Sequence, residues 1–121
     1  MALEASILNL FIGSEQRHRH PFFRSFYYTD GVSYLAEDGQ AYWLIDAIFS
    51  WQTDKRIKND RMLQEFQLWQ LKVEENRSAI LTCSRDEDDV VISQNIPFTD
   101  FSLPEIELYL VEKVLMLPSE Y

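Results

Sequence analysis

The fold is decided by residues 66–96, which read FQLWQLKV-EENR-SAILTCS-RDEDD-VVISQNI. The segment holds three runs rich in β-branched and aromatic residues, Phe66–Val73, Ser78–Ser84 and Val90–Ile96. Runs of this length that are bounded by polar turns are typical of β-strands. Because the polar separators are short, the three strands are predicted to pair as antiparallel hairpins.

Two more strands are predicted downstream. Glu105–Val111 and Val114–Leu117 flank the dipeptide Glu112-Lys113, which resembles a tight reversal between paired strands. Polar residues such as Gln67 and Gln94, together with several acids, are available to one face of the resulting sheet. Antiparallel sheets tolerate one solvated face, so we expect the polar residues to lie there.

Helical periodicity precedes these strands. A short first helix is predicted to end at Gly13, with an apolar stripe of Leu3, Ile7, Leu10 and Phe11. An extended segment runs through Phe26, Tyr27 and Tyr28. A second helix is predicted after Thr29-Asp30-Gly31 and continues to about Asp38. Ala41–Gln52 predicts a third helix that is apolar around most of its circumference, whereas Thr53–Arg61 is polar and predicts an exposed connection.

The order of these elements predicts an α+β fold. We expect one domain over residues 1–121, with N-terminal helices packed on one face of a C-terminal antiparallel sheet of about five strands. The 121 residues are 46% hydrophobic and 14% aromatic, which suits a single domain with a substantial core.

Composition limits the cellular setting and the ligands. Cys83 is the sole cysteine, which excludes an internal disulfide and favours a reducing cytoplasm. The amino terminus has no basic region before an apolar stretch, and no apolar run approaches the ~20 residues that span a bilayer, so no membrane association is expected. The three glycines never cluster as phosphate loops require, and no cofactor is expected.

Charge limits the partners. Of the net charge of −9, residues 1–61 carry −1 and residues 62–121 carry −8. Nucleic-acid binders need clustered Lys and Arg to neutralise phosphates, so direct nucleic-acid binding is not expected. The acidic second half instead favours a protein partner with a basic surface.

Several fragments together carry a family resemblance. They are Gly13-Ser14-Glu15, Tyr28-Thr29-Asp30-Gly31, Tyr34-Leu35-Ala36-Glu37, Ala41-Tyr42-Trp43-Leu44-Ile45-Asp46, Phe66-Gln67-Leu68-Trp69-Gln70-Leu71, Leu81-Thr82-Cys83, Thr99-Asp100-Phe101 and Leu117-Pro118-Ser119-Glu120-Tyr121. In this order they resemble an uncharacterised domain-of-unknown-function family of small, single-domain bacterial proteins, some of them carried on mobile elements or phages. The resemblance implies a bacterial cytoplasmic setting and no particular activity.

The two histidines are the first candidate site residues. His18 and His20 lie two residues apart, so on an extended segment both rings would face one side. A metal site would need further carboxylates such as Asp30 or Asp46, and the neighbouring arginines would repel a cation. Exposed or loop-packing histidines are therefore the favoured interpretation, and no metal site is expected.

Asp46 is the most unusual acid because its predicted helix is so apolar. Burial would raise its pKa and suit a general acid, whereas a place on a narrow polar stripe with Tyr42, Ser50 and Thr53 would make it structural. Asp30 follows Thr29 and is explained by helix capping. Asp46, Asp30 and His18 are thus the weak catalytic candidates.

Two other features favour structural interpretations. Cys83 lies within a predicted strand and shares its face with Leu81, which indicates a buried small residue. An acidic loop consists of Asp86, Glu87, Asp88 and Asp89. It lacks the glycine and the spacing of a calcium loop, so a solvated hairpin connection is expected.

Three functions remain as hypotheses. The first is a non-catalytic protein-interaction module that binds a basic surface of another protein. The second is a small enzyme that uses carboxylates and histidine. The third is a self-associating structural protein, since aromatic-rich small domains often cover part of their surface by forming a homodimer.

Overall fold

Five strands from the second half of the chain lie side by side in one sheet in the computed structural model, which describes residues 10, 17–86 and 88–121. These strands are β3 (Phe66–Val73), β4 (Ala79–Ser84), β5 (Val90–Ile96), β6 (Glu105–Val111) and β7 (Val114–Met116). All five were predicted, with ends that agree within one residue. Except for Leu10, the predicted first helix lies outside the described residues.

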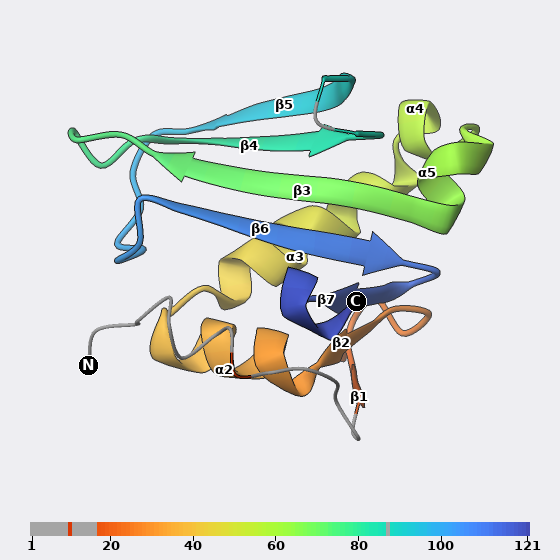
Figure 1. Ribbon diagram of the computed structural model, residues 1–121, viewed down its shortest axis with the longest axis horizontal. Coiled ribbons are helices and arrows are strands. Elements are labelled where there is room, and N and C mark those ends of the chain that lie inside the picture. The colour runs from red at the N-terminus through yellow and green to blue at the C-terminus, as the bar shows by residue number, and fades with distance from the viewer. Residues whose placement is uncertain (1–9, 11–16, 87) are drawn as a thin grey trace.

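The sheet is larger than predicted and not purely antiparallel. Two short strands, β1 (Arg17–Arg19) and β2 (Tyr27–Thr29), extend it to seven strands in the order β1-β2-β7-β6-β3-β4-β5 (Figure 1). β2 runs parallel to β7, with Tyr28 opposite Leu115. The α+β class is confirmed. The prediction of N-terminal helices on about five antiparallel strands is wrong, because the described helices lie mid-chain and two strands precede them.

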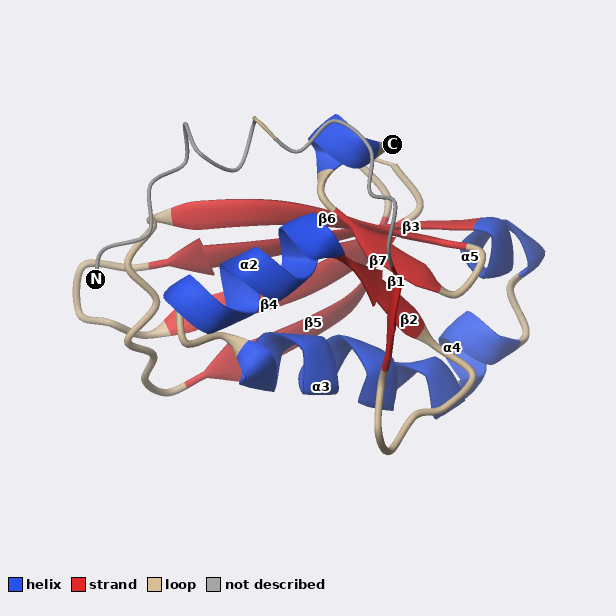
Figure 2. Cartoon of the chain, turned by 90° about the horizontal axis from the view of Figure 1, so that it is seen from below, coloured by secondary structure: helices blue, strands red, loops and turns tan. Residues whose placement is uncertain are grey.

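The described helices follow β2 directly. They are α2 (Asp30–Asp38), α3 (Tyr42–Ser50), α4 (Lys55–Lys58) and α5 (Arg61–Glu65), with 3-10 turns at Trp51–Thr53 and Pro118–Glu120. Thr29 caps α2, because its Oγ1 accepts a hydrogen bond from the Val32 amide at 3.3 Å. Figure 2 shows α2 and α3 next to each other across the strands.

The segment Thr53–Arg61 is more ordered than predicted. Asp54 caps α4 and Asp60 caps α5, each by accepting a hydrogen bond from a backbone amide. Between these caps Ile57 is fully buried. Most of the segment is exposed, as predicted, but its two short capped helices and the buried Ile57 were not predicted, because periodicity over so few residues does not reveal them.

The core lies between α3 and the helix-facing side of the central strands. Ile48 and Phe49 of α3 are fully buried, as are Trp69 of β3, Leu81 of β4 and Leu108 of β6. All of them belong to one contiguous hydrophobic cluster. Successive strand residues alternate between faces, so Lys72, Ile80 and Glu107 point to the other, exposed face.

The prediction that the polar residue Gln67 lies on a solvated face of the sheet is wrong. Its side chain is 3% exposed and lies on the helix-facing side, where Oε1 accepts from the Trp69 indole at 2.8 Å and from Nε2 of Gln52 at 2.9 Å. Its own Nε2 donates to the Leu63 carbonyl at 2.9 Å. Gln94 also faces α3 and accepts from the indole of Trp51. Hydrogen bonding inside the core satisfies the amide of Gln67, whereas Gln94 is half-buried and only its Oε1 is bonded within the described chain.

The segments before and after β7 are fixed by a tight turn and by a contact with α2. Glu112 and Lys113 both have positive φ, 45° and 73°, which confirms the predicted tight reversal. At the carboxyl end Glu120 folds back on α2, where its Oε1 accepts from Thr29 Oγ1 at 2.6 Å. None of the described helices is long and apolar enough to cross a membrane.

Candidate functional site

His20 anchors the loop between β1 and β2. The residue is 6% exposed, and its ring lies 5.1 Å from that of Phe23 and 5.5 Å from that of Phe49. Its Nδ1 accepts hydrogen bonds from the backbone amides of Phe22 at 3.0 Å and Phe23 at 2.9 Å. The His20 amide in turn donates to the Phe26 carbonyl, so the loop is closed around the imidazole.

Asp46 meets His20 from the outer side of α3. Oδ1 of Asp46 lies 2.5 Å from Nε2 of His20. Because Nδ1 already accepts two amide protons, it must carry a lone pair, and the ring proton therefore lies on Nε2 and is donated to Asp46. The imidazole is neutral in this arrangement. The contact thus positions the carboxylate without cancelling its charge.

Asp46 itself is not buried. Its side chain is 62% exposed, and it lies on the polar stripe of α3 with the exposed residues Tyr42 and Ser50. Within the described part of the chain, Oδ2 of Asp46 makes no hydrogen bond, and no Lys or Arg forms an ion pair with it. A fixed negative group therefore faces solvent.

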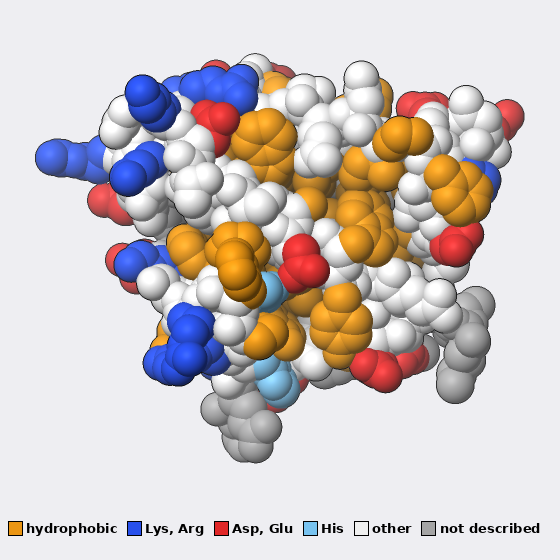
Figure 3. Space-filling model, turned by 180° about the vertical axis from the view of Figure 1, so that it is seen from behind, with side chains coloured by type: hydrophobic (Ala, Val, Ile, Leu, Met, Phe, Trp, Pro, Cys, Tyr) orange, Lys and Arg blue, Asp and Glu red, His pale blue; other side chains and the backbone are white. Residues whose placement is uncertain are grey.

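Two hollows adjoin this carboxylate, one on each side of the His20–Asp46 contact. One encloses about 440 Å³ and is lined mainly by Phe22, Phe23 and Trp43. The other encloses about 400 Å³ and has Tyr28 and Tyr42 on its wall. Figure 3 shows this side of the molecule, where hydrophobic side chains gather around a histidine and an acidic group.

We call this surface the Asp46 face. It consists of Phe22, Phe23, Tyr28, Tyr42, Trp43 and Asp46. Phe22 is 79% exposed and Tyr42 46% exposed, both large fractions for aromatic side chains. The Phe22 ring is braced edge-on against Phe23 at 4.9 Å between centroids. The Asp46 face therefore presents aromatic rings, including the Phe22 ring packed against Phe23, around one carboxylate.

His18 forms a separate pair with the other predicted carboxylate. Its Nε2 lies 2.9 Å from Oδ1 of Asp30, in the first turn of α2, and its ring stacks on Tyr28 at 5.3 Å. Both groups are more than a third exposed. Asp30 is thus not the cap of α2, because Thr29 fills that role.

The structure brings the predicted residues together in two pairs rather than one cluster. Asp30 and Asp46 are the carboxylates predicted as possible partners of the histidines, and each approaches a different one. Among the described residues no group of three or more His, Cys, Asp or Glu side chains is arranged to hold a metal ion. His20 was not among the predicted catalytic candidates; the one signal in the sequence is the Pro21-Phe22-Phe23 run that follows it, which indicates a loop with aromatic residues.

The remaining candidates have structural surroundings. Cys83 is fully buried, and burial raises the pKa of its thiol to about 12. In the acidic loop, Asp89 lies 2.8 Å from Nη1 of Arg85, and the same guanidinium also hydrogen-bonds Asp60. That hydrogen bond holds the pKa of Asp60 below its usual range. The described part of this loop is therefore tied to the start of α5.

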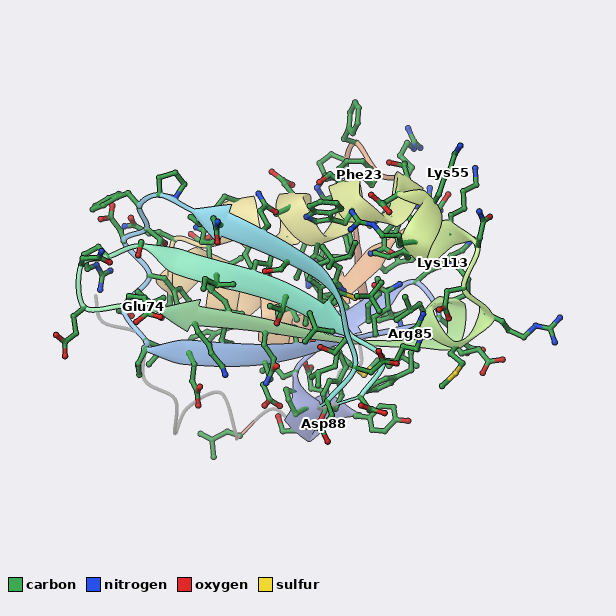
Figure 4. The ribbon with its side chains drawn as sticks, turned by 90° about the horizontal axis from the view of Figure 1, so that it is seen from above. Phe23, Lys55, Glu74, Arg85, Asp88 and Lys113 are labelled. Atoms are coloured by element: carbon green, nitrogen blue, oxygen red, sulfur yellow. The ribbon has the colours of Figure 1, made fainter. Side chains whose placement is uncertain are left out.

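Charge is distributed along the length of the molecule. Lys55 of α4 and Lys113 of the β6–β7 turn lie at one end, and Glu74 of the β3–β4 turn lies at the other (Figure 4). Phe23 projects on the helix side between them.

Comparison with known proteins gives a family and no activity. No curated protein and no solved structure matches the chain. The sequence does match a family of unknown function, DUF6876, over residues 3–121. This agrees with the uncharacterised family that the sequence fragments resemble. Since the match covers nearly all of the 121 residues, the chain belongs to the family of unknown function DUF6876.

Proposed function

We propose that this protein is a non-catalytic protein-interaction module that binds a basic partner protein through the Asp46 face. The observation that carries the proposal is the His20–Asp46 contact. His20 uses both ring nitrogens to hold Asp46 and the loop amides, so it has none left to move a proton for a substrate. The buried His20 side chain thus serves to position the exposed carboxylate of Asp46.

The aromatic rings of the face support binding to a protein. Large exposed aromatic side chains contribute most to interfaces when they are held in place before binding, because little entropy is then lost. Phe22 and Tyr42 are exposed, while Phe23 is packed between Phe22 and the buried core ring of Phe49. A charged group ringed by such side chains matches the make-up of a recognition surface.

Charge supports a basic partner. The carboxylate at the centre of the face has no Lys or Arg counterion among the described residues, so it keeps its negative charge although residues 1–61, which supply the face, carry only −1 of the chain's net charge of −9. A positive group on a partner would find this uncompensated negative group at close range. The proposal moves the expected contact from the acidic strands to α3 and the β1–β2 loop.

Site-specific photocross-linking tests the proposal. A benzoylphenylalanine placed at Phe22 is expected to cross-link a partner protein in cells of the source organism. The matched control carries the same group at Ile80, which is an exposed apolar residue on the opposite face of the sheet. Equal cross-linking from both positions, or none from position 22, would refute binding through the Asp46 face.

The His18–Asp30 pair favours a small enzyme as the second candidate. With Nε2 on Asp30, His18 keeps Nδ1 without a hydrogen-bond partner in the described part of the chain, as a general base requires. Turnover of a chromogenic ester, phosphoester or glycoside would favour this candidate if it disappears in both His18→Ala and Asp30→Asn. Turnover that survives both changes, or its absence from all three substrate classes, would count against it.

A further inference from the structure

We propose that the group bound at Asp46 is the guanidinium of an arginine side chain on the partner protein. This inference rests on the proposed function and names the chemistry of its contact. It starts from the carboxylate, of which Oδ1 accepts from His20 and Oδ2 makes no hydrogen bond within the described chain. Both oxygens still have acceptor capacity, because a carboxylate oxygen accepts more than one hydrogen bond.

The neutral charge of the His20 ring leaves the negative charge of Asp46 available to an incoming cation. A doubly protonated imidazole beside Asp46 would supply the positive charge itself and weaken any attraction for an incoming cation. The two amide protons at Nδ1 exclude that form while the loop keeps its structure. The face therefore offers a full negative charge whose position is fixed by a buried ring.

The flanking rings distinguish arginine from lysine. Trp43 and Phe23 line the hollow on one side of Asp46, and Tyr42 lines the hollow on the other. A planar guanidinium can stack on such rings while its N–H groups reach the carboxylate, and it loses less hydration than an ammonium group. The apolar floor also suits the three methylene groups of the arginine stem.

Small model compounds test the inference directly. We would titrate N-acetyl-arginine N-methylamide into ¹⁵N-labelled protein at 0.15 M salt, where general attraction to the acidic chain is screened beyond roughly 8 Å. We expect saturable shifts at Asp46 and at the Trp43 indole, with a Kd in the millimolar range. The lysine analogue should bind about fivefold more weakly or worse, because it lacks the planar stacking group. The neutral citrulline analogue should give no saturable shift.

Two variants locate the site. Asp46→Asn is expected to weaken arginine binding about tenfold or more, because a charge-assisted hydrogen bond is lost. Glu107→Gln removes one charge from the exposed face of the sheet and should leave binding unchanged. Phe22→Ala should weaken the arginine analogue more than the lysine analogue, since it removes only apolar and stacking contact.

The outcomes separate this inference from the proposed function. Equal binding of the arginine and lysine analogues, or binding that Asp46→Asn leaves unchanged, would overturn the arginine assignment. If no analogue binds while residue 22 still cross-links a partner, the interaction module stands and the arginine assignment fails. If the partner cross-links are also absent, the proposed function fails with it.

Discussion

Nε2 of His20 lies 2.5 Å from Oδ1 of Asp46, and this contact joins the loop after β1 to the outer side of α3. The two residues are 26 positions apart in the chain. The loop closes on the same imidazole through the amides of Phe22 and Phe23. One buried ring therefore sets both the shape of the aromatic loop and the position of the charged group beside it.

The first prediction concerns the protonation of that ring. Long-range ¹H–¹⁵N spectra at neutral pH should show Nδ1 of His20 unprotonated and Nε2 protonated, because Nδ1 accepts two amide protons. In His20→Asn the shorter side chain can still accept hydrogen bonds from the loop amides but cannot contact Asp46. The NMR chemical shifts of the loop amides should therefore be preserved, while those of Asp46 should change. A proton on Nδ1 would contradict the geometry and the proposals built on it.

The sequence predicted the central sheet well because each long strand carries its own signal. Phe66–Val73 and Val90–Ile96 have the residues and the bounding turns of strands, and both are confirmed to the residue. β1 was not predicted, since three residues cannot show a period. It pairs with β2 as a local hairpin, whereas the parallel pairing of β2 with β7 depends on contacts across most of the chain.

The candidate site could be predicted only in part, because it too depends on contacts between residues far apart in the chain. Sequence spacing put His18 and His20 on one side, but nothing local shows that His20 leaves the strand and turns into the core. The prediction from side-chain polarity was also wrong. Gln67 and Gln94 were predicted to face water because their side chains are amides, but both lie on the helix-facing side of the sheet. Gln67 lies in the core because Gln52, Leu63 and Trp69 together supply its hydrogen bonds.

The second prediction concerns that buried amide. Gln67→Met keeps the side-chain length but leaves the Trp69 indole N–H without its partner and removes both hydrogen bonds to the Gln52 amide, whose Nε2 still donates to the Ile48 carbonyl. The free energy of unfolding, measured by urea denaturation, should fall by about 1–3 kcal/mol. The control Gln70→Met lies on the exposed face and should stay within about 0.5 kcal/mol of the wild type. Equal effects at the two positions would contradict the assigned faces.

The third prediction concerns Gly31 in the first turn of α2. Alanine is the better helix former by up to about 1 kcal/mol, so an open site would gain stability. Here the added Cβ would lie 2.5 Å from Oε1 of Glu120 and 2.7 Å from Cδ1 of Leu117. Gly31→Ala should therefore destabilise the fold, by about 1–3 kcal/mol in urea denaturation.

A double-mutant cycle checks the cause of that loss. In a Glu120→Ala background the carboxylate no longer stands in the way of the Cβ. Gly31→Ala should then cost at least about 0.5 kcal/mol less than in the wild type, because the two positions are in contact. Strict additivity would show that the carboxyl-terminal turn does not pack on α2 as described.

The fourth prediction concerns acid and the Asp60–Arg85 pair. The Arg85 hydrogen bond lowers the pKa of Asp60 in the folded protein. Its stabilising effect is therefore complete above the unfolded pKa near ~3.9 and is lost as the pH falls through the lower folded value. The stability difference between wild type and Arg85→Met should be largest at neutral pH and shrink in this acid range.

Urea denaturation at several pH values between neutral and strongly acidic conditions measures that difference. Asp89→Asn serves as the control, since it removes the other carboxylate that contacts Arg85. It should leave the acid dependence largely in place because Asp60 keeps its partner. A wild-type minus Arg85→Met difference that stays constant with pH would contradict the pairing.

The fifth prediction concerns Cys83, the one side chain of the sequence suited to nucleophilic catalysis through sulfur. Its pKa is raised to about 12 by burial, whereas a free thiol titrates near ~8.5. At pH 8 the native protein should react with a disulfide reagent at least about 10³-fold more slowly than the urea-unfolded chain, because so little thiolate is present and the sulfur is covered.

A Cys83→Ala/Thr82→Cys variant moves the thiol to the opposite, partly exposed face and should react rapidly while folded. Fast reaction of Cys83 in the native protein would contradict its buried position next to Gln67, whereas slow reaction leaves the sulfur as part of the core that supports α3 and the Asp46 face.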